Sequence, residues 1–282
     1  MLVRLNEVLK FAEDNKCAIG AFNTPTSENL FAVIRAAEKR NVPVILMHAE
    51  LHEEIAPIDE IGPLMVAASK NSTVPICCLL DHGEHLEYIK KALDIGFTGV
   101  MYDGSLLPYN ENVKNTIACI EMAKKYGADV EAEIGVLGGR ESLHASDNLK
   151  KEDLYTDPEL ALKFVKETNI DALACSFGTA HGLYKAKPCL DFDRLKRIKE
   201  LVKIPLVMHG GSGVSAEDYD MSITSGIRKI NYYSYAAKAG VDAAIEYINK
   251  HNNINFYHEI SSYVTDKIEE DVGKAMDIFY KR

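Results

Sequence analysis

An aspartate and a histidine stand side by side where an apolar run ends, in Leu79-Leu80-Asp81-His82-Gly83. The apolar residues 74–80 predict a buried strand. Because successive side chains of an extended chain point to opposite sides, Asp81 and His82 are expected to project differently from one strand end. One of them could then hold a metal ion while the other carries a proton. The same pair would also be explained by an Asp that caps the next helix, beside a histidine with ordinary hydrogen bonds.

Apolar runs typical of strands recur along the chain, and each is followed by a helical pattern. Parallel pairing of such units predicts an α/β fold, a (β/α)8 TIM barrel formed as a single domain over residues 1–282. A doubly wound open sheet is the alternative. A helical tail runs from Tyr235 to about Tyr280 and is interrupted at 251–253. The eight expected strands cover 17–23, 42–48, 74–80, 98–103, 128–134, 172–177, 205–209 and 227–231.

The composition argues against several classes of protein. The formal net charge is −10 and the lysines are scattered, which argues against a nucleic-acid or anionic-membrane surface. A small anionic substrate stays possible, because a few backbone amides can bind a phosphate. No signal-peptide pattern is present and no apolar run reaches about 18 residues, so neither a leader nor a membrane span is expected. Six cysteines without a C-x-x-C pair predict reduced thiols and a cytoplasmic protein.

In the expected barrel, the C-terminal ends of all strands surround one mouth, which is where barrel active sites lie. Three histidines at these ends suit a catalytic Zn²⁺ site with an open coordination position: His82, His181 and His209. Asp103 and Glu133 could support these ligands or replace one of them. Asn23 and Asn231 also end strands. We expect the other six histidines to be surface or local residues: His48, His52, His85, His144, His251 and His258.

Two glycine- or serine-containing turns open the last helices of the barrel. They are His209-Gly210-Gly211-Ser212-Gly213 and Asn231-Tyr232-Tyr233-Ser234. Turns at helix N-termini present backbone N–H groups to an anion, and the loops after strands seven and eight are the usual phosphate site of barrels. Tight turns without a ligand are the alternative explanation.

Longer stretches around these residues resemble the class II, zinc-dependent ketose-bisphosphate aldolases, a family that includes fructose- and tagatose-bisphosphate aldolases. The resemblance extends over nearly the whole chain. It is carried by residues 81–83, 96–105, 130–139, 177–184 and 207–213.

The resemblance implies a metal centre and an acid–base pair. Zinc would be held by the three histidines named above, and Asp81 would move the proton on the aldehyde side. Asn231 would steady the enediolate, and Glu141 would exchange the proton at the carbon of the enolised ketose. Because zinc would stabilise the enediolate, no Schiff-base lysine is needed. Lys229 is the only candidate for one, and we expect its charge to sit away from the metal.

The resemblance also implies a substrate, dihydroxyacetone phosphate being one half of it. Asn23 and Tyr233 are further expected substrate contacts. A monovalent cation, Na⁺ or K⁺, would help to hold the phosphate. The products would be dihydroxyacetone phosphate and glyceraldehyde 3-phosphate. The reaction would belong to carbohydrate metabolism, such as glycolysis. The enzyme would be a homo-oligomer, either a dimer or a tetramer. The residues expected at the phosphate are Gly182, Gly210, Gly211, Ser212 and Ser234.

Three positions depart from the family pattern. Met47-His48-Ala49-Glu50 stands where the family has Gln-x-Ser near the far phosphate, and Tyr233 stands where fructose enzymes commonly have Asp. The sequence ends with residues 278–282, where many family members have a Phe-Gly-Ser or similar segment followed by basic residues. These departures favour ketose 1,6-bisphosphates generally, fructose or tagatose, over fructose alone. One alternative is an aldolase that releases dihydroxyacetone phosphate and a non-phosphorylated aldehyde, as in inositol breakdown. Others are a metal-dependent sugar-phosphate isomerase or epimerase and a non-catalytic phosphosugar-binding protein.

Overall fold

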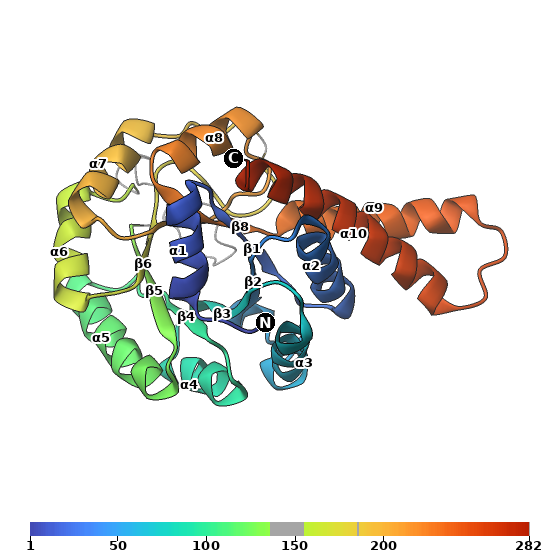
Figure 1. Ribbon diagram of the computed structural model, residues 1–282, viewed down its shortest axis with the longest axis horizontal. Helices are drawn as coiled ribbons and strands as arrows, with labels where there is room; N and C mark the ends of the chain where they lie inside the picture. Colours follow the sequence, from blue (N-terminus) through green and yellow to red (C-terminus); the bar gives the residue numbers. More distant parts are fainter. Residues whose placement is uncertain (136–154, 185, 282) are drawn as a thin grey trace.

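The computed structural model describes residues 1–135, 155–184 and 186–281 and has a closed parallel barrel at its centre (Figure 1). Each strand pairs in parallel with the next, and the last pairs with the first, so the expected (β/α)8 barrel is confirmed and the open sheet is excluded. The strands are β1 (Ile19–Asn23), β2 (Val44–Ala49), β3 (Ile76–Gly83), β4 (Gly99–Tyr102), β5 (Asp129–Ile134), β6 (Ala172–Cys175), β7 (Leu206–Met208) and β8 (Ile227–Tyr232).

Helices surround the barrel, and several begin at capping side chains. Thr26, Asp191 and Ser215 each accept a hydrogen bond from a backbone N–H three residues ahead, which satisfies a donor at the helix start. The described helices are α1 (Leu5–Asn15), α2 (Ser27–Arg40), the 3₁₀ helix η1 (Glu50–His52), α3 (Ile58–Asn71), α4 (Leu86–Ile95), α5 (Tyr109–Tyr126), α6 (Pro158–Thr168), α7 (Phe192–Val202), α8 (Ala216–Thr224), α9 (Ser234–Lys250) and α10 (Tyr257–Phe279).

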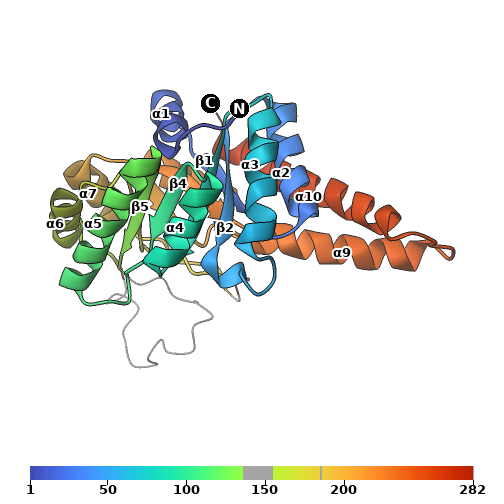
Figure 2. The same ribbon diagram turned by 90° about the horizontal axis from the view of Figure 1, so that it is seen from below.

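The apolar core has two layers, because the strands bury side chains on both faces. Outward-facing side chains pack under the helices, and inward-facing ones fill the barrel. Helix α1 crosses one end of the barrel (Figure 2), where Leu5 and Leu9 join the interior cluster. The opposite end, where the strands reach their C-termini, is therefore the end that stays available for a site. All six cysteines are free thiols, and all but Cys189 are buried.

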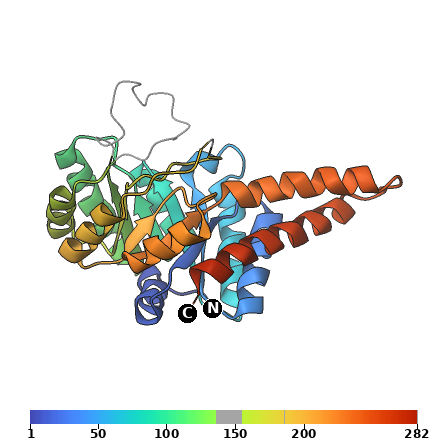
Figure 3. The ribbon, with the colours of Figure 1, turned by 90° about the horizontal axis from the view of Figure 1, so that it is seen from above.

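The chain ends in a helical hairpin that projects from the barrel (Figure 3). The expected interruption at 251–253 is confirmed, because α9 ends at Lys250 and α10 begins at Tyr257. Three apolar side chains on α9 are more than half exposed: Val241, Ile245 and Ile248. No helix in the described part of the chain is both long enough and apolar enough to cross a membrane.

A partly buried carboxylate ties α1 to the barrel. Glu13 pairs with Lys199 of α7 and lies 2.8 Å from Nε of Arg228 on β8. Burial by itself raises the pKa of Glu13, but Lys199 and Arg228 outweigh it and hold that pKa below its ordinary value. The ionised form therefore stabilises the fold above the unfolded-state pKa, and this contribution is lost as the pH falls through the lower folded-state pKa.

We predict that Glu13→Gln lowers the free energy of unfolding at pH 7 by about 1 kcal/mol, a small value because the side chain is one-third exposed. The deficit should shrink as the pH falls through the pKa of Glu13. Urea denaturation of both proteins over an acidic pH series measures it. Glu121→Gln, on an exposed part of α5, is the matched control. A deficit that stays constant down to the acid limit would contradict the prediction.

Candidate active site

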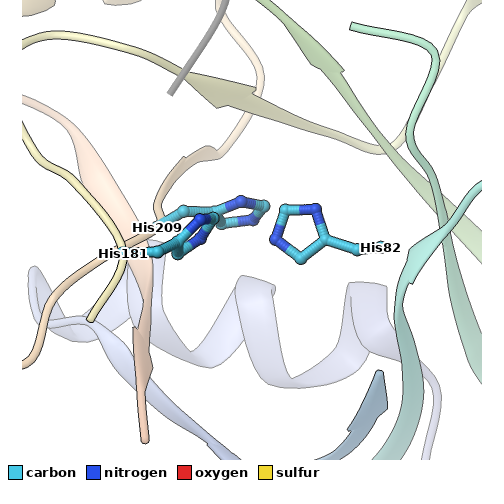
Figure 4. Close-up of side chains that lie close together, drawn as sticks. All are labelled: His82, His181 and His209. Atoms are coloured by element: carbon cyan, nitrogen blue, oxygen red, sulfur yellow. The ribbon is translucent and has the colours of Figure 1, made fainter. Parts of the chain in front are cut away.

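Three imidazole rings converge at the C-terminal end of the barrel (Figure 4). His82 lies in β3, and His181 and His209 follow β6 and β7. The ring centroid of His82 is 4.6 Å from that of His209 and 5.1 Å from that of His181. Each of the three rings offers a nitrogen within 4.8 Å of the other two, which is close enough for one ion to be shared.

The backbone at this strand end departs from regular alternation. His82 has φ of 46°, in the left-handed region, and the register of β3 against β4 shifts between Leu80 and Gly83. Such a conformation costs a non-glycine residue about 1–3 kcal/mol and is common at functional sites. With the bulge, β3 extends to Gly83, and the next helix begins at Leu86. This local change in backbone direction places the side chains of Asp81 and His82 together at the mouth of the barrel.

Carboxylates orient two of the rings. Nδ1 of His82 lies 2.6 Å from Oδ2 of Asp103, whose other oxygen accepts a hydrogen bond of 2.7 Å from the Ser105 hydroxyl. Nε2 of His209 lies 3.0 Å from Oε1 of Glu131. A carboxylate accepts, so Nδ1 of His82 and Nε2 of His209 carry the protons. The opposite nitrogen of each ring is then the one that can bind a metal ion.

The buried carboxylate of Glu133 indicates that these residues suit a cation. Its side chain is 1% exposed, and neither of its oxygens has a hydrogen-bond partner among the described residues. Oε2 lies 3.3 Å from Nδ1 of His209 and 3.9 Å from Nδ1 of His82. Burial lowers the pKa of His209, but Glu131 and Glu133 raise it to about 9. The site thus favours a positive charge at the His209 ring. Three converging imidazole nitrogens, two of them on rings held by carboxylates, fit a divalent transition metal.

Asp81 is held beside the histidines by two amides. The Nδ2 groups of Asn23 and Asn231 donate to its two oxygens at 3.1 and 3.0 Å. Burial alone raises the pKa of Asp81. The charges of His82, Lys229 and His209, together with the hydrogen bond from the Asn23 side chain, outweigh burial and hold this pKa well below its usual range. Asp81 is therefore an ionised, fixed carboxylate that can take up a proton.

A buried ion pair supports the site from inside the barrel. Nζ of Lys229 on β8 lies 2.8 Å from Oε2 of Glu131, and both side chains are fully buried. The lysine charge is thus held by the carboxylate that orients His209. Glu131 was not among the residues expected at the site. Its spacing could have indicated it, because Glu131 lies two residues before Glu133 and therefore shares the same face of β5.

Backbone contacts shape the turns that follow β6, β7 and β8. The Tyr184 hydroxyl accepts from the Ala180 amide and donates to the Gly210 carbonyl, both at 2.8 Å. Gly210 has φ of 62°, and a Cβ there would lie 2.3 Å from the Ala180 carbonyl oxygen, so only glycine fits. The Gly211 amide donates to the Asn231 carbonyl at 3.0 Å. This amide is engaged within the protein and is not directed at a ligand.

The expected substrate residues lie around one cavity of about 590 Å³. Asp81, His82 and His181 line it too, whereas Glu141 lies outside the described residues. The residues of the expected substrate site that line this cavity are Asn23, Gly182, Gly210, Gly211, Ser212, Asn231, Tyr233 and Ser234.

Two of the six histidines expected to be surface or local residues are buried, so neither of them is a surface residue. His48 is 0% and His52 5% exposed; His48 lies in β2, and η1, which contains His52, contacts β3. Nε2 of His48 lies 2.9 Å from the Tyr88 hydroxyl. His52 and His85 both line the cavity, and the His52 ring lies 5.1 Å from that of Tyr233.

A model of the family "Fructose-bisphosphate aldolase class-II" matches residues 3–282. The chain belongs to this family. It is therefore an enzyme of the lyase class. It is 38% identical to a fructose-bisphosphate aldolase of Geobacillus stearothermophilus, with 98% of this chain and 96% of that protein covered. It is 35% identical to one of Staphylococcus aureus, at the same coverage.

Solved structures show the same architecture. The YdjI aldolase of Escherichia coli K12 superposes with a TM-score of 0.87 at 30% identity, over 99% of this chain and 97% of that one. A fructose-bisphosphate aldolase of Campylobacter jejuni has a TM-score of 0.79 at 22% identity, covering 99% of this chain and 95% of that one. The second likeness concerns the fold alone.

We predict that Lys229→Met lowers the free energy of unfolding by about 3–5 kcal/mol, because Glu131 would remain as a buried charge without its cation. The double variant Lys229→Met/Glu131→Gln should recover part of this loss. Urea denaturation of the wild type, both single variants and the double variant measures the coupling. Lys238→Met, an exposed change on α9, should have little effect. Purely additive losses would contradict the buried pair.

Proposed function

We propose that this enzyme is a zinc-dependent aldolase that reversibly cleaves a ketose phosphate to dihydroxyacetone phosphate and an aldehyde. The observation that carries the proposal is the ionised Asp81, fixed by two amides next to three converging histidines. An isomerase or epimerase could use the same groups, but family membership favours C–C cleavage. The same observation argues against a non-catalytic phosphosugar-binding protein.

The proposed cleavage starts with a proton transfer to Asp81. The carboxylate takes the proton of the C4 hydroxyl, the C4–O electrons form the carbonyl of the leaving aldehyde, and the C3–C4 bond breaks. The electron pair of that bond passes to the ketone half, which becomes an enediolate. Zinc held by His82, His181 and His209 would supply a Lewis acid for this negative charge. In the reverse direction, Asp81 returns the proton to the new hydroxyl.

Other residues would hold the ketone half. We assign Asn231 to the enediolate, since its Nδ2 already faces Asp81 at 3.0 Å and can steady the developing charge. Asp103 and Glu133 would support the zinc ligands or replace one of them, as their distances to His82 and His209 allow. Glu141 would protonate the enediolate carbon.

The phosphate of dihydroxyacetone phosphate would lie against Gly182, Gly210, Ser212 and Ser234, all of which line the cavity. Ser234 is the first residue of α9, where backbone amides favour an anion. Gly211 would act through the turn geometry, because its amide donates to Asn231. A monovalent cation, Na⁺ or K⁺, would bind the carbonyls near these turns.

Fructose 1,6-bisphosphate and tagatose 1,6-bisphosphate are the first substrates to test, because curated relatives are named fructose-bisphosphate aldolases. Glyceraldehyde 3-phosphate would be the second product of either. Release of a non-phosphorylated aldehyde is the alternative to which the residues around Glu50 and Tyr233 point. Residues 3–282 match one family model, which supports a single domain. A homo-oligomer and a cytoplasmic location stay predictions.

We predict that a chelator abolishes cleavage and that added Zn²⁺ restores it, because the enediolate would lose its stabilising charge. A coupled assay for dihydroxyacetone phosphate measures both states. Borohydride added with substrate should not inactivate the enzyme, since no Schiff base forms. Full activity in excess chelator, together with borohydride inactivation, would exclude the zinc mechanism.

We predict that Asp81→Ala lowers kcat by about 10²–10⁴, the usual contribution of a positioned acid or base. Zinc content, measured by elemental analysis, should stay at the wild-type level because Asp81 is not a ligand. Asp193→Ala, in a fully exposed position of α7, is the control. Loss of zinc in Asp81→Ala would make Asp81 part of the metal centre instead.

A further inference from the structure

The two ends of the cavity differ in character. In a closed barrel of eight strands, β2 and β3 stand across from β6 and β7. The turns after β6 and β7 bring glycines, serine and backbone to the cavity. The opposite side, which we call the far end, is built after β2 and β3 and closed by one residue after β8. Its residues are Ala49, Glu50, Leu51, His52, Glu84, His85 and Tyr233.

The far end carries negative charge. None of the described residues that line the cavity is a lysine or an arginine, whereas Glu50 and Glu84 both line it. Lys91 of α4 is not among the lining residues, and its Nζ lies 3.2 Å from Glu53 and 2.8 Å from Asp59. Among the described residues of this end, a phosphate would therefore meet carboxylates and not cations.

Glu50 also occupies the position where an anion would otherwise bind. Its Oε2 accepts hydrogen bonds from the backbone amides of Glu84 at 2.7 Å and His85 at 3.3 Å, just before α4 begins at Leu86. The N-terminus of a helix is a natural site for a phosphate. Here the protein fills that site with its own carboxylate.

His85 does not reverse this balance. Nδ1 of His85 lies 2.6 Å from Oε1 of Glu50, and that hydrogen bond raises the pKa of His85. The positive charge of His85 is thus neutralised by Glu50. His48 lies behind the cavity wall, where burial lowers its pKa to about 4, so its ring is neutral at pH 7.

We infer that, granted the proposed aldolase function, the aldehyde half of the substrate is an uncharged hydroxyaldehyde. The substrate class is then a ketose 1-phosphate, in preference to a 1,6-bisphosphate. Hydroxyl groups can donate to the carboxylates of Glu50 and Glu84, and the facing rings of His52 and Tyr233 offer a wall for the carbon chain. A second phosphate, or a carboxylate, would find the amides before α4 already taken by the Glu50 carboxylate and would be repelled by it.

The test compares cleavage of fructose 1-phosphate and tagatose 1-phosphate with cleavage of their 1,6-bisphosphates, with release of dihydroxyacetone phosphate as the readout. We expect kcat/KM to be roughly tenfold or more higher for the monophosphate of the preferred sugar. Higher salt should narrow this ratio, because it screens repulsion but leaves the shape of the cavity unchanged. A preference for the bisphosphate overturns the inference. No cleavage of any of the four would overturn the proposed function instead.

Two variants locate the source of the selectivity. Glu50→Gln keeps an acceptor for the amides before α4 and removes one charge, so it should raise relative cleavage of the bisphosphate by roughly tenfold. Glu87→Gln removes the same charge from the first turn of α4 at an exposed position that does not line the cavity. It should leave the ratio unchanged. Equal shifts in both variants would mean a long-range field and would overturn the assignment to the far end.

Discussion

The balance of buried charge at the centre of the barrel is the constraint on which the site depends. Asp81, Glu131 and Glu133 are all nearly or fully buried, and a buried carboxylate is unstable without compensation. Two amides compensate Asp81, and Lys229 compensates Glu131. Glu133 has no hydrogen bond among the described residues. A cation shared by the neighbouring imidazoles would supply that compensation, which supports the proposed metal site.

The strained strand end gives the two adjacent residues separate tasks. A regular strand would send Asp81 and His82 to opposite faces, and one of them would leave the mouth. The left-handed backbone at His82 and the register shift beside it keep both at the mouth. Asp103 then fixes the His82 ring, while the amides of Asn23 and Asn231 fix Asp81. Metal binding and proton transfer are thus assigned to neighbouring residues that do not compete.

Charge also separates the two halves of the cavity. Near β6 and β7 the lining is mostly glycine backbone and small polar side chains, which suit a phosphate. Near β2 and β3 the helix start is already occupied by Glu50, and Glu84 stands beside it. Under the proposed function, the end where the ketone half would react and the end that would meet the aldehyde therefore differ in chemical character.

The sequence alone determined the barrel, because strand and helix periodicities are local and the parallel connection leaves few topologies. It also determined which histidines meet, since every strand end reaches the same mouth. Only the tertiary structure decided the contacts that depend on register and loop path. Lys229 pairs with Glu131 inside the barrel, and η1 places His52 in the lining of the cavity. Glu50 accepts hydrogen bonds from the backbone amides just before α4. These pairs join residues far apart in the chain, and no local pattern encodes which oxygen faces which nitrogen.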